Sequence, residues 1–168
     1  MDEVKFHGFM DADWAGSTTN RKSTSGGLFS IGSTTVSWYN RKQRSMALSS
    51  AEAEHMAASL AACEAIWMRK ILVGLFNSHL DPTMIYCGNQ SYIKLLVNLV
   101  FHDRSKHIDI RYHHIRDCVQ WKIMLLSYIP TEDQDADILT KVLTRSKLEY
   151  HRDRIGVPDN PYIFEREC

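Results

Sequence analysis

The sequence lacks the features that would place it among membrane, secreted or strongly charged proteins. No apolar run in its 168 residues approaches the ~20 residues of a membrane-spanning helix. The first five residues lack the apolar centre of a signal peptide, so we expect neither secretion nor membrane contact. Lysine plus arginine and aspartate plus glutamate number 20 each, so the net charge indicates no class of partner. Hydrophobic residues at 44% and charged residues at 24% are ordinary for one globular domain.

Cysteine is also scarce, and its spacing excludes a disulfide framework or a zinc ribbon. The four cysteines form no Cys-x-x-Cys pair and stand at Cys63, Cys87, Cys118 and Cys168. This pattern favours reduced thiols and an intracellular setting, either cytoplasmic or nuclear. Cys118 has His107, His113 and His114 nearby, but no acid or cysteine pair completes a tetrahedral set. We therefore interpret these histidines as residues of a helix surface.

The hydrophobic pattern predicts an α/β domain over residues 1–157, followed by an irregular tail at 158–168. We expect strands at residues 7–12, 26–32, 35–39, 83–87 and 122–129, and helices at residues 49–76, 92–99, 107–121 and 133–143. The short turns between the first three strands indicate antiparallel pairing. The apolar strand at 83–87 lies between helices, which indicates a central, parallel position. The predicted architecture is a mixed sheet with helices on its faces.

The long helix has a recognisable start and two apolar faces. Ser49 and Glu52 fit a capping box at its N-terminus. Larger apolar residues recur at helical spacing, at Met56, Leu60, Cys63, Trp67 and Ile71. Ala57, Ala58 and Ala61 form a second face of small residues, suited to close contact with a sheet. Glu54 shares that face, where a carboxylate is costly to bury unless it is paired or holds a metal.

Two further acidic segments raise the same question, whether a carboxylate there has a functional reason. Asp11 and Asp13 either begin a turn, as aspartate often does, or place a carboxylate in an apolar strand for a functional reason. Asp133 and Asp135 are explained by the favourable interaction of acids with a helix N-terminus. Asp137 lies a turn further in, beside apolar residues, and is the least surface-like of the three.

Six motifs, in order, carry a resemblance to a known family. They are DADWAG at 11–16, KQ at 42–43, ALSSAEAE at 47–54, IYCGNQS at 85–91, KHIDIRYH at 106–113, and TEDQ with ADILTK between 131 and 141. From about residue 6 to 157 the chain resembles the ribonuclease H domain of copia-type retrotransposon polyproteins. The resemblance implies the ribonuclease H-like fold, a five-stranded mixed sheet of three antiparallel and two parallel strands flanked by helices.

The resemblance also implies a two-metal nuclease site. In that family four carboxylates hold two divalent ions, usually Mg²⁺, which cut the RNA strand of an RNA–DNA hybrid. Three of the four fall on Asp11, Glu54 and Asp137, the predicted catalytic and metal-binding residues, with Mg²⁺ or Mn²⁺ as cofactor. The fourth falls on Gly88, which has no side chain, so we expect an incomplete metal site and impaired hydrolysis. Asp135, where the family commonly has an apolar or neutral residue, is not expected to replace it.

Polar residues near these motifs are the candidate hybrid-binding residues, namely Arg21, Lys22, Arg41, Lys42, Gln43, Asn89, Gln90 and Ser91. The basic ones, with Arg44, are expected in loops beside the first three strands. They either contact phosphates or form a solvated rim. The amides and Ser91 are expected to reach minor-groove edges and 2′-hydroxyls. Two functions stay open: a weak hybrid-cutting enzyme, or a domesticated, inactive module that binds nucleic acid or a protein partner.

Overall fold

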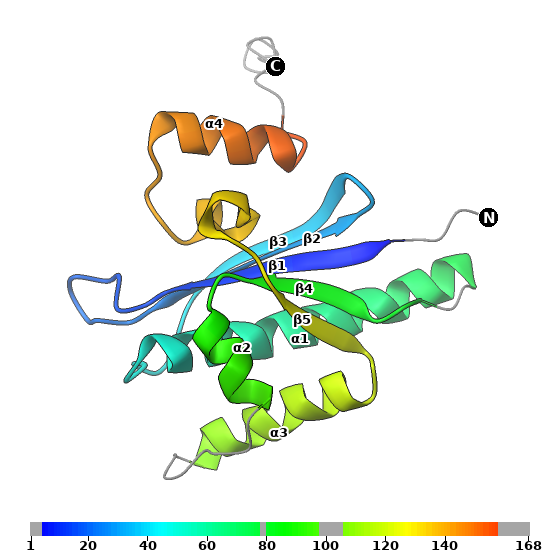
Figure 1. Ribbon diagram of the computed structural model, residues 1–168, viewed down its shortest axis with the longest axis horizontal. Coiled ribbons are helices and arrows are strands. Elements are labelled where there is room, and N and C mark those ends of the chain that lie inside the picture. Colours follow the sequence, from blue (N-terminus) through cyan, green and yellow to red (C-terminus); the bar gives the residue numbers. More distant parts are fainter. Residues whose placement is uncertain (1–4, 78–79, 98–105, 158–168) are drawn as a thin grey trace, which may run out of the picture.

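The computed structural model describes residues 5–77, 80–97 and 106–157, and it centres on a five-stranded mixed sheet (Figure 1). The strands are β1 (Phe6–Asp13), β2 (Thr24–Ile31), β3 (Thr34–Lys42), β4 (Thr83–Cys87) and β5 (Met124–Tyr128). Their order across the sheet is β3-β2-β1-β4-β5. Pairing is antiparallel from β1 to β3 and parallel from β1 through β4 to β5, which confirms the predicted fold class.

The alternation of side chains along β1 creates a core on each face of the sheet. Met10 and Ala12 point into the main core, together with Phe29 of β2. Phe9 points to the opposite face, where it packs with Leu28 and Ala136 in a smaller cluster. Asp11 alternates with Met10 and Ala12, so it lies on the side of the smaller cluster.

The long helix α1 (Ser50–Phe76) covers the main core with its small residues. Its start is a capping box: Ser49 accepts a hydrogen bond from the Glu52 backbone N–H at 3.2 Å, and Glu52 accepts one from Leu48 N–H at 2.8 Å. The alanine face is fully buried, at Ala53, Ala57, Ala58, Ala61, Ala62 and Ala65. Alanine side chains allow close approach to the sheet; Met56, Met68 and Leu72 also enter this core, whereas Trp67 is 55% exposed.

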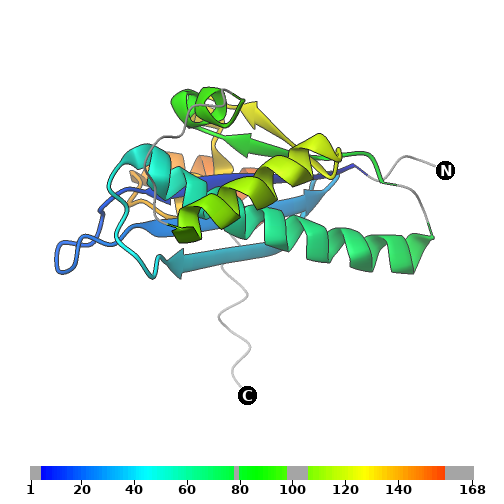
Figure 2. The ribbon, with the colours of Figure 1, turned by 90° about the horizontal axis from the view of Figure 1, so that it is seen from below.

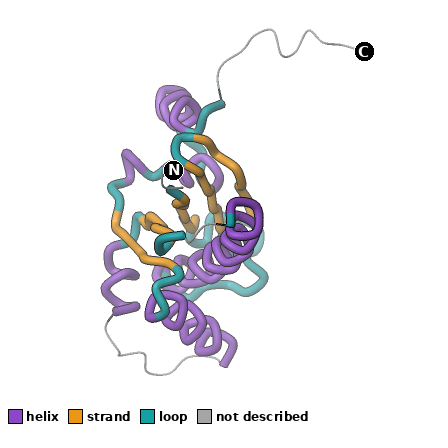
Figure 3. The backbone as a smooth tube through the Cα atoms, turned by 90° about the vertical axis from the view of Figure 1, so that its right-hand side faces the viewer, coloured by secondary structure: helices purple, strands orange, loops and turns teal. Residues whose placement is uncertain are grey.

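The remaining helices form layers on both faces of the sheet. α2 (Gln90–Val97) and α3 (Lys106–Gln120) lie on the same side as α1, and α1 runs beside α3 (Figure 2). On the other side are α4 (Arg145–Arg154) and two short 3₁₀ helices, η1 (Thr131–Asp133) and η2 (Asp135–Leu139). Figure 3 shows the helices gathered around the strands. Within the described ranges, no helix has both the length and the apolar character needed to cross a bilayer.

The C-terminal part corrects two expectations. The helix predicted at 133–143 is wrong: the chain forms η1 and η2 there, and the next α-helix, α4, begins only at Arg145. Gln134 separates the two 3₁₀ helices in an extended conformation instead of completing a capping box. Its side chain is buried, donating from Nε2 to the Met10 carbonyl at 3.1 Å and accepting from Ala136 N–H at 3.3 Å. The tail at 158–168 lies outside the described residues.

A further correction concerns the basic stretch after the third predicted strand. β3 continues through Arg41 to Lys42, because β2 begins at Thr24 and pairs with Lys42. Arg41 and Lys42 are therefore strand residues and not loop residues, whereas Arg21, Lys22 and Arg44 do lie outside the strands.

Candidate active site

An acidic cleft opens at the C-terminal ends of β1 and β4. The parallel pairing of these strands ends at Met10 and Cys87, and the chain beyond them surrounds a cleft of about 370 Å³. This is the switch between the antiparallel and parallel parts of the sheet, where α/β proteins commonly bind ligands. The lining includes all four positions that the resemblance picked out, Asp11, Glu54, Gly88 and Asp137, together with Asn89, Gln90, Ser91, Gln134 and Lys141.

Asp11 and Asp137 face a shared lysine inside the cleft. Each is 3% exposed, Asp11 at the end of β1 and Asp137 on η2. Lys141 Nζ lies 3.0 Å from Asp11 Oδ1 and 2.9 Å from Asp137 Oδ1, and Thr140 also donates to Asp11 Oδ2. Burial lowers the pKa of Lys141, but the two carboxylates outweigh burial and raise it overall. Lys141 therefore remains an ammonium group that bridges the two acids.

Glu54 reaches the same cleft from α1, on the other face of the sheet. Its carboxyl accepts a hydrogen bond from the Ala12 backbone N–H, next to Asp11 in the chain. It is 6% exposed, and burial, followed by the negative charge of Asp11, raises the pKa of Glu54 to about 8. Burial also raises the pKa of the Cys87 thiol, whose Sγ lies 3.9 Å from Glu54 Oε2. At neutral pH the metal-free cleft therefore holds a mostly protonated glutamate beside two lysine-paired aspartates.

Gly88 leaves an open position in the cleft wall. A Cβ added to Gly88 would meet Gln134 Nε2 at 3.7 Å, which is ordinary van der Waals contact. The glycines with a positive φ in the described chain are Gly32 and Gly156, so the backbone at Gly88 suits any L-residue. The structure thus has room for a carboxylate at position 88, although the sequence supplies none.

The predicted hybrid-binding residues fall into three groups. Asn89, Gln90 and Ser91 line the cleft. Basic side chains lie at the same end of the sheet, because Lys42 pairs with Thr24 and Thr24 pairs with Asp13. Two strand spacings place this end of β3 about 10 Å from β1. Arg41 and Lys42 belong to this end of β3, and Arg21 and Lys22 to the loop after β1.

Gln43 is the predicted contact that the structure does not bring to the cleft. Its side chain is 6% exposed and donates from Nε2 to Ser25 Oγ at 2.8 Å and to the Ala53 carbonyl at 2.9 Å. These bonds join the end of β3 to β2 and α1. The Gln43 amide is therefore occupied in holding the fold.

Sequence comparisons with known proteins establish which proteins this chain is related to. No protein-family model matches the chain. It is 40% identical over 153 residues, or 91% of its length, to the retrovirus-related Pol polyprotein from transposon TNT 1-94 of Nicotiana tabacum. It is 37% identical over 158 residues, or 94% of its length, to the corresponding polyprotein from transposon RE1 of Arabidopsis thaliana. The chain is homologous to these Pol polyproteins. It spans 11% of the length of each.

The solved structures confirm the fold of this Pol homologue. The crystal structure of LC11-RNase H1 in complex with an RNA/DNA hybrid has a TM-score of 0.57 and 11% sequence identity. The match covers 81% of this chain and 94% of that one. At this identity the likeness establishes the ribonuclease H-like fold, in agreement with the motifs in the sequence.

The donor set of the Pol homologue suits a hard divalent cation. Asp11, Glu54 and Asp137 supply the carboxylate oxygens that Mg²⁺ and Mn²⁺ prefer. In the part of the chain that the structure describes, no three His, Cys, Asp or Glu side chains are arranged to hold a metal ion. Lys141 engages two of the three acids instead. The carboxylate oxygens therefore suit Mg²⁺ or Mn²⁺ chemically, whereas in this structure two of the three acids are paired with the Lys141 ammonium group.

Asp135 points away from the cleft and anchors η2 to α4. It is 4% exposed, and its Oδ1 lies 2.8 Å from His151 Nδ1 and 2.9 Å from Arg154 Nε. As expected from its separate position, Asp135 does not replace the missing carboxylate. Its partners hold the segment that carries Asp137.

Replacing Asp135 with asparagine is expected to destabilise the fold by about 3 kcal/mol, because it leaves His151 and Arg154 without their buried carboxylate. Urea unfolding at pH 7 measures this free energy. Asp133→Asn is the matched control, since Asp133 is 45% exposed and contacts the same Arg154 at 3.3 Å. The control is expected to lose less than about 1 kcal/mol. Equal losses in both variants would contradict an anchoring role for Asp135.

Sequence reasoning missed the roles of Gln134 and Lys141 in the cleft and of Thr140 beside it. Lys141 follows Asp137 by four residues, a spacing that commonly pairs opposite charges on one face. This signal was present in the sequence. The contacts of Thr140 and Gln134 with β1 span 129 and 124 residues, so no local pattern could reveal them.

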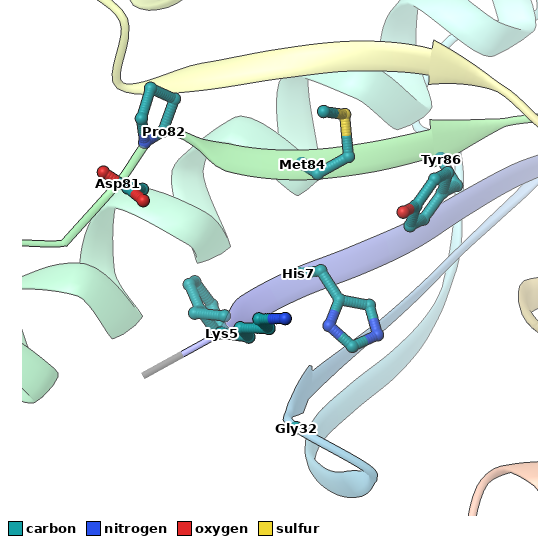
Figure 4. A pocket seen from close by; sticks show the side chains of 8 residues that line it. Lys5, His7, Gly32, Asp81, Pro82, Met84 and Tyr86 are labelled. Atoms are coloured by element: carbon teal, nitrogen blue, oxygen red, sulfur yellow. The ribbon is translucent and has the colours of Figure 1, made fainter. Parts of the chain in front are cut away.

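A second hollow of about 480 Å³ lies at the other end of β1 and β4 (Figure 4). Its lining includes Lys5, His7, Asp81, Met84 and Tyr86, and the rings of His7 and Tyr86 lie 6.2 Å apart. His7 precedes Asp11 by four residues, about 13 Å along the strand. This hollow contains none of the predicted site residues and is separate from the acidic cleft.

Proposed function

We propose that this domain binds RNA–DNA hybrids and cuts their RNA strand weakly or not at all. The observation that carries the proposal is the meeting of Asp11, Glu54 and Asp137 in one polar cleft, with Gly88 at the fourth position. The ribonuclease H-like fold supports the nucleic-acid partner, and one structural neighbour was solved with an RNA/DNA hybrid.

Each part of the cleft has a distinct role in the proposal. Asp11, Glu54 and Asp137 would hold divalent cations. These cations would activate water and stabilise the leaving oxygen at the cut phosphate. Asn89, Gln90 and Ser91, which line the cleft, would donate hydrogen bonds to the hybrid beside the acids. The basic end of β3 and the loop after β1 would hold the phosphate backbone about 10 Å away.

The second candidate function is a catalytically inactive binding module. Two observations favour it: Gly88 supplies no carboxylate, and Lys141 pairs with two of the remaining three acids. One form of this module would keep the basic edge and bind hybrids without cutting them. The other form would not bind hybrids, and its partner would then be a protein.

Hybrid affinity is expected to fall steeply with salt, because phosphate contacts release counterions. Fluorescence anisotropy with a labelled RNA–DNA hybrid, in EDTA and at several salt concentrations, gives the slope of log K against log salt. Arg41→Ala and Lys42→Ala are each expected to reduce that slope by about one. Lys70→Ala removes the same charge from the far part of α1 and should leave the slope unchanged. Salt-independent binding, or none, would contradict the proposal and point to a protein partner.

A further inference from the structure

The position of Lys141 gives the acidic cleft a cation of its own. Its ammonium nitrogen contacts one oxygen of Asp11 and one of Asp137, at 3.0 and 2.9 Å. Both carboxylates are buried, whereas the Lys141 side chain is 37% exposed and enters from the rim. Between described residues, no other lysine or arginine forms an ion pair with either acid.

We infer that Lys141 competes with divalent cations for Asp11 and Asp137 and so sets the metal affinity of the cleft. The ammonium group already occupies one oxygen of each carboxylate and repels a divalent cation brought near it, so we expect metal binding to displace Lys141 from those oxygens. Its flexible four-carbon stem and partial exposure allow that movement. The inference rests on the proposed metal site and adds to it the residue that opposes metal binding.

Gly88 increases the effect of Lys141 on metal affinity, because it adds no carboxylate to the cleft. Three carboxyl groups and one ammonium carry at most two net negative charges. A fourth carboxylate would favour divalent ions, which gain more than a monovalent ammonium from each added charge. Without that fourth carboxylate a divalent cation binds more weakly, so Lys141 competes more effectively for the oxygens of Asp11 and Asp137.

Mn²⁺ binding to the whole chain, without nucleic acid, tests the inference. The signal of free Mn²⁺ in electron paramagnetic resonance gives the dissociation constant at pH 7.5. Lys141→Gln is expected to lower the Mn²⁺ dissociation constant by about tenfold or more, because it removes the competing charge. Lys141→Arg keeps a cation and is expected to stay near the unaltered chain. Lys70→Gln, a matched loss of one exposed charge on α1, is expected to change nothing.

Thermal unfolding supplies a second readout that does not depend on catalysis. In EDTA, Lys141→Gln is expected to unfold at a lower temperature, because two buried carboxylates lose their counter-cation. Saturating Mn²⁺ should then raise its unfolding temperature more than that of the unaltered chain. An unchanged or higher Mn²⁺ dissociation constant in folded Lys141→Gln would overturn the inference, as would a lack of Mn²⁺ binding by both chains.

The result is separable from the proposed function. Tighter Mn²⁺ binding by Lys141→Gln in a chain that ignores hybrids would uphold the competition and remove the hybrid-binding function. Salt-dependent hybrid binding, together with a Mn²⁺ dissociation constant that Lys141→Gln leaves unchanged, would uphold the hybrid-binding function and overturn the competition.

Discussion

Gly88→Asp is expected to raise Mg²⁺-dependent cleavage of an RNA–DNA hybrid by at least about a hundredfold. The metal ions of such a site contribute several kcal/mol of transition-state stabilisation, and each ~1.4 kcal/mol is tenfold in rate, so restoring a carboxylate that holds them should recover much of the rate. The structure has room for the new side chain, since the nearest atom to an added Cβ is Gln134 Nε2 at 3.7 Å. The neighbouring Asn89, Gln90 and Ser91 already line the cleft. Gel analysis of a labelled RNA strand measures the rate.

The controls separate charge from shape at position 88. Gly88→Asn has nearly the same volume without the charge and is expected to stay at the low rate of the unaltered chain. Adding Asp11→Asn to Gly88→Asp should abolish cleavage. For the unaltered chain we expect little cleavage with Mg²⁺ and at most partial recovery with Mn²⁺. Ordinary cleavage by the unaltered chain, abolished by Asp11→Asn, would show that another group compensates for Gly88.

Glu54→Gln is expected to stabilise the metal-free protein strongly at alkaline pH and little at acidic pH. The pKa of Glu54 rises from an ordinary 4.5 to about 8 on folding, because the carboxyl is buried beside Asp11. The folded state therefore binds this proton more tightly than the unfolded state. The resulting stabilisation is fully present below pH 4.5 and is lost as the pH rises to about 8. Glutamine is neutral throughout and avoids that loss, which amounts to as much as about 5 kcal/mol.

Urea unfolding in EDTA at pH 5 and pH 9 measures this effect. The free energy of unfolding of Glu54→Gln should exceed that of the unaltered chain by several kcal/mol at pH 9, and the gap should nearly close at pH 5. Glu149→Gln is the control, since Glu149 is 43% exposed on α4 and should change stability little at either pH. A gap that is equal at both pH values would show that Glu54 is already ionised in the folded state.

Much of the fold could be predicted because its signals are local. The capping box at Ser49 and Glu52 defines the start of α1, and the alanine face that follows defines the side that meets the sheet. The apolar strand at 83–87 could be placed inside the sheet with parallel neighbours from its composition and its flanking helices, although the central strand is β1. Each of these features depends on residues within a few turns or a single strand, so the sequence displays them directly.

The C-terminal segment could not be predicted in the same way. Gln134 carries a capping-box pattern, but its side chain is held by the Met10 carbonyl, 124 residues away. Asp135 looks like an ordinary acid at a helix start, but His151 and Arg154 bury it. Local pattern favoured one helix, and distant partners stabilised two short 3₁₀ helices and a later α4.

The candidate site likewise combines features that the sequence reveals with features that only the folded chain reveals. By itself, the sequence singled out Asp11, Glu54 and Asp137 and, through the family resemblance, predicted that Gly88 stands where a fourth carboxylate is expected, because motif order and residue identity are properties of the chain. Tertiary structure alone decided that Gln43 holds the fold together and that Lys141 bridges Asp11 and Asp137. It also decided the raised pKa of Glu54. The physical reason is that burial and charge pairing depend on which surfaces meet across the sheet, and β1, α1 and η2 meet only after the chain has folded.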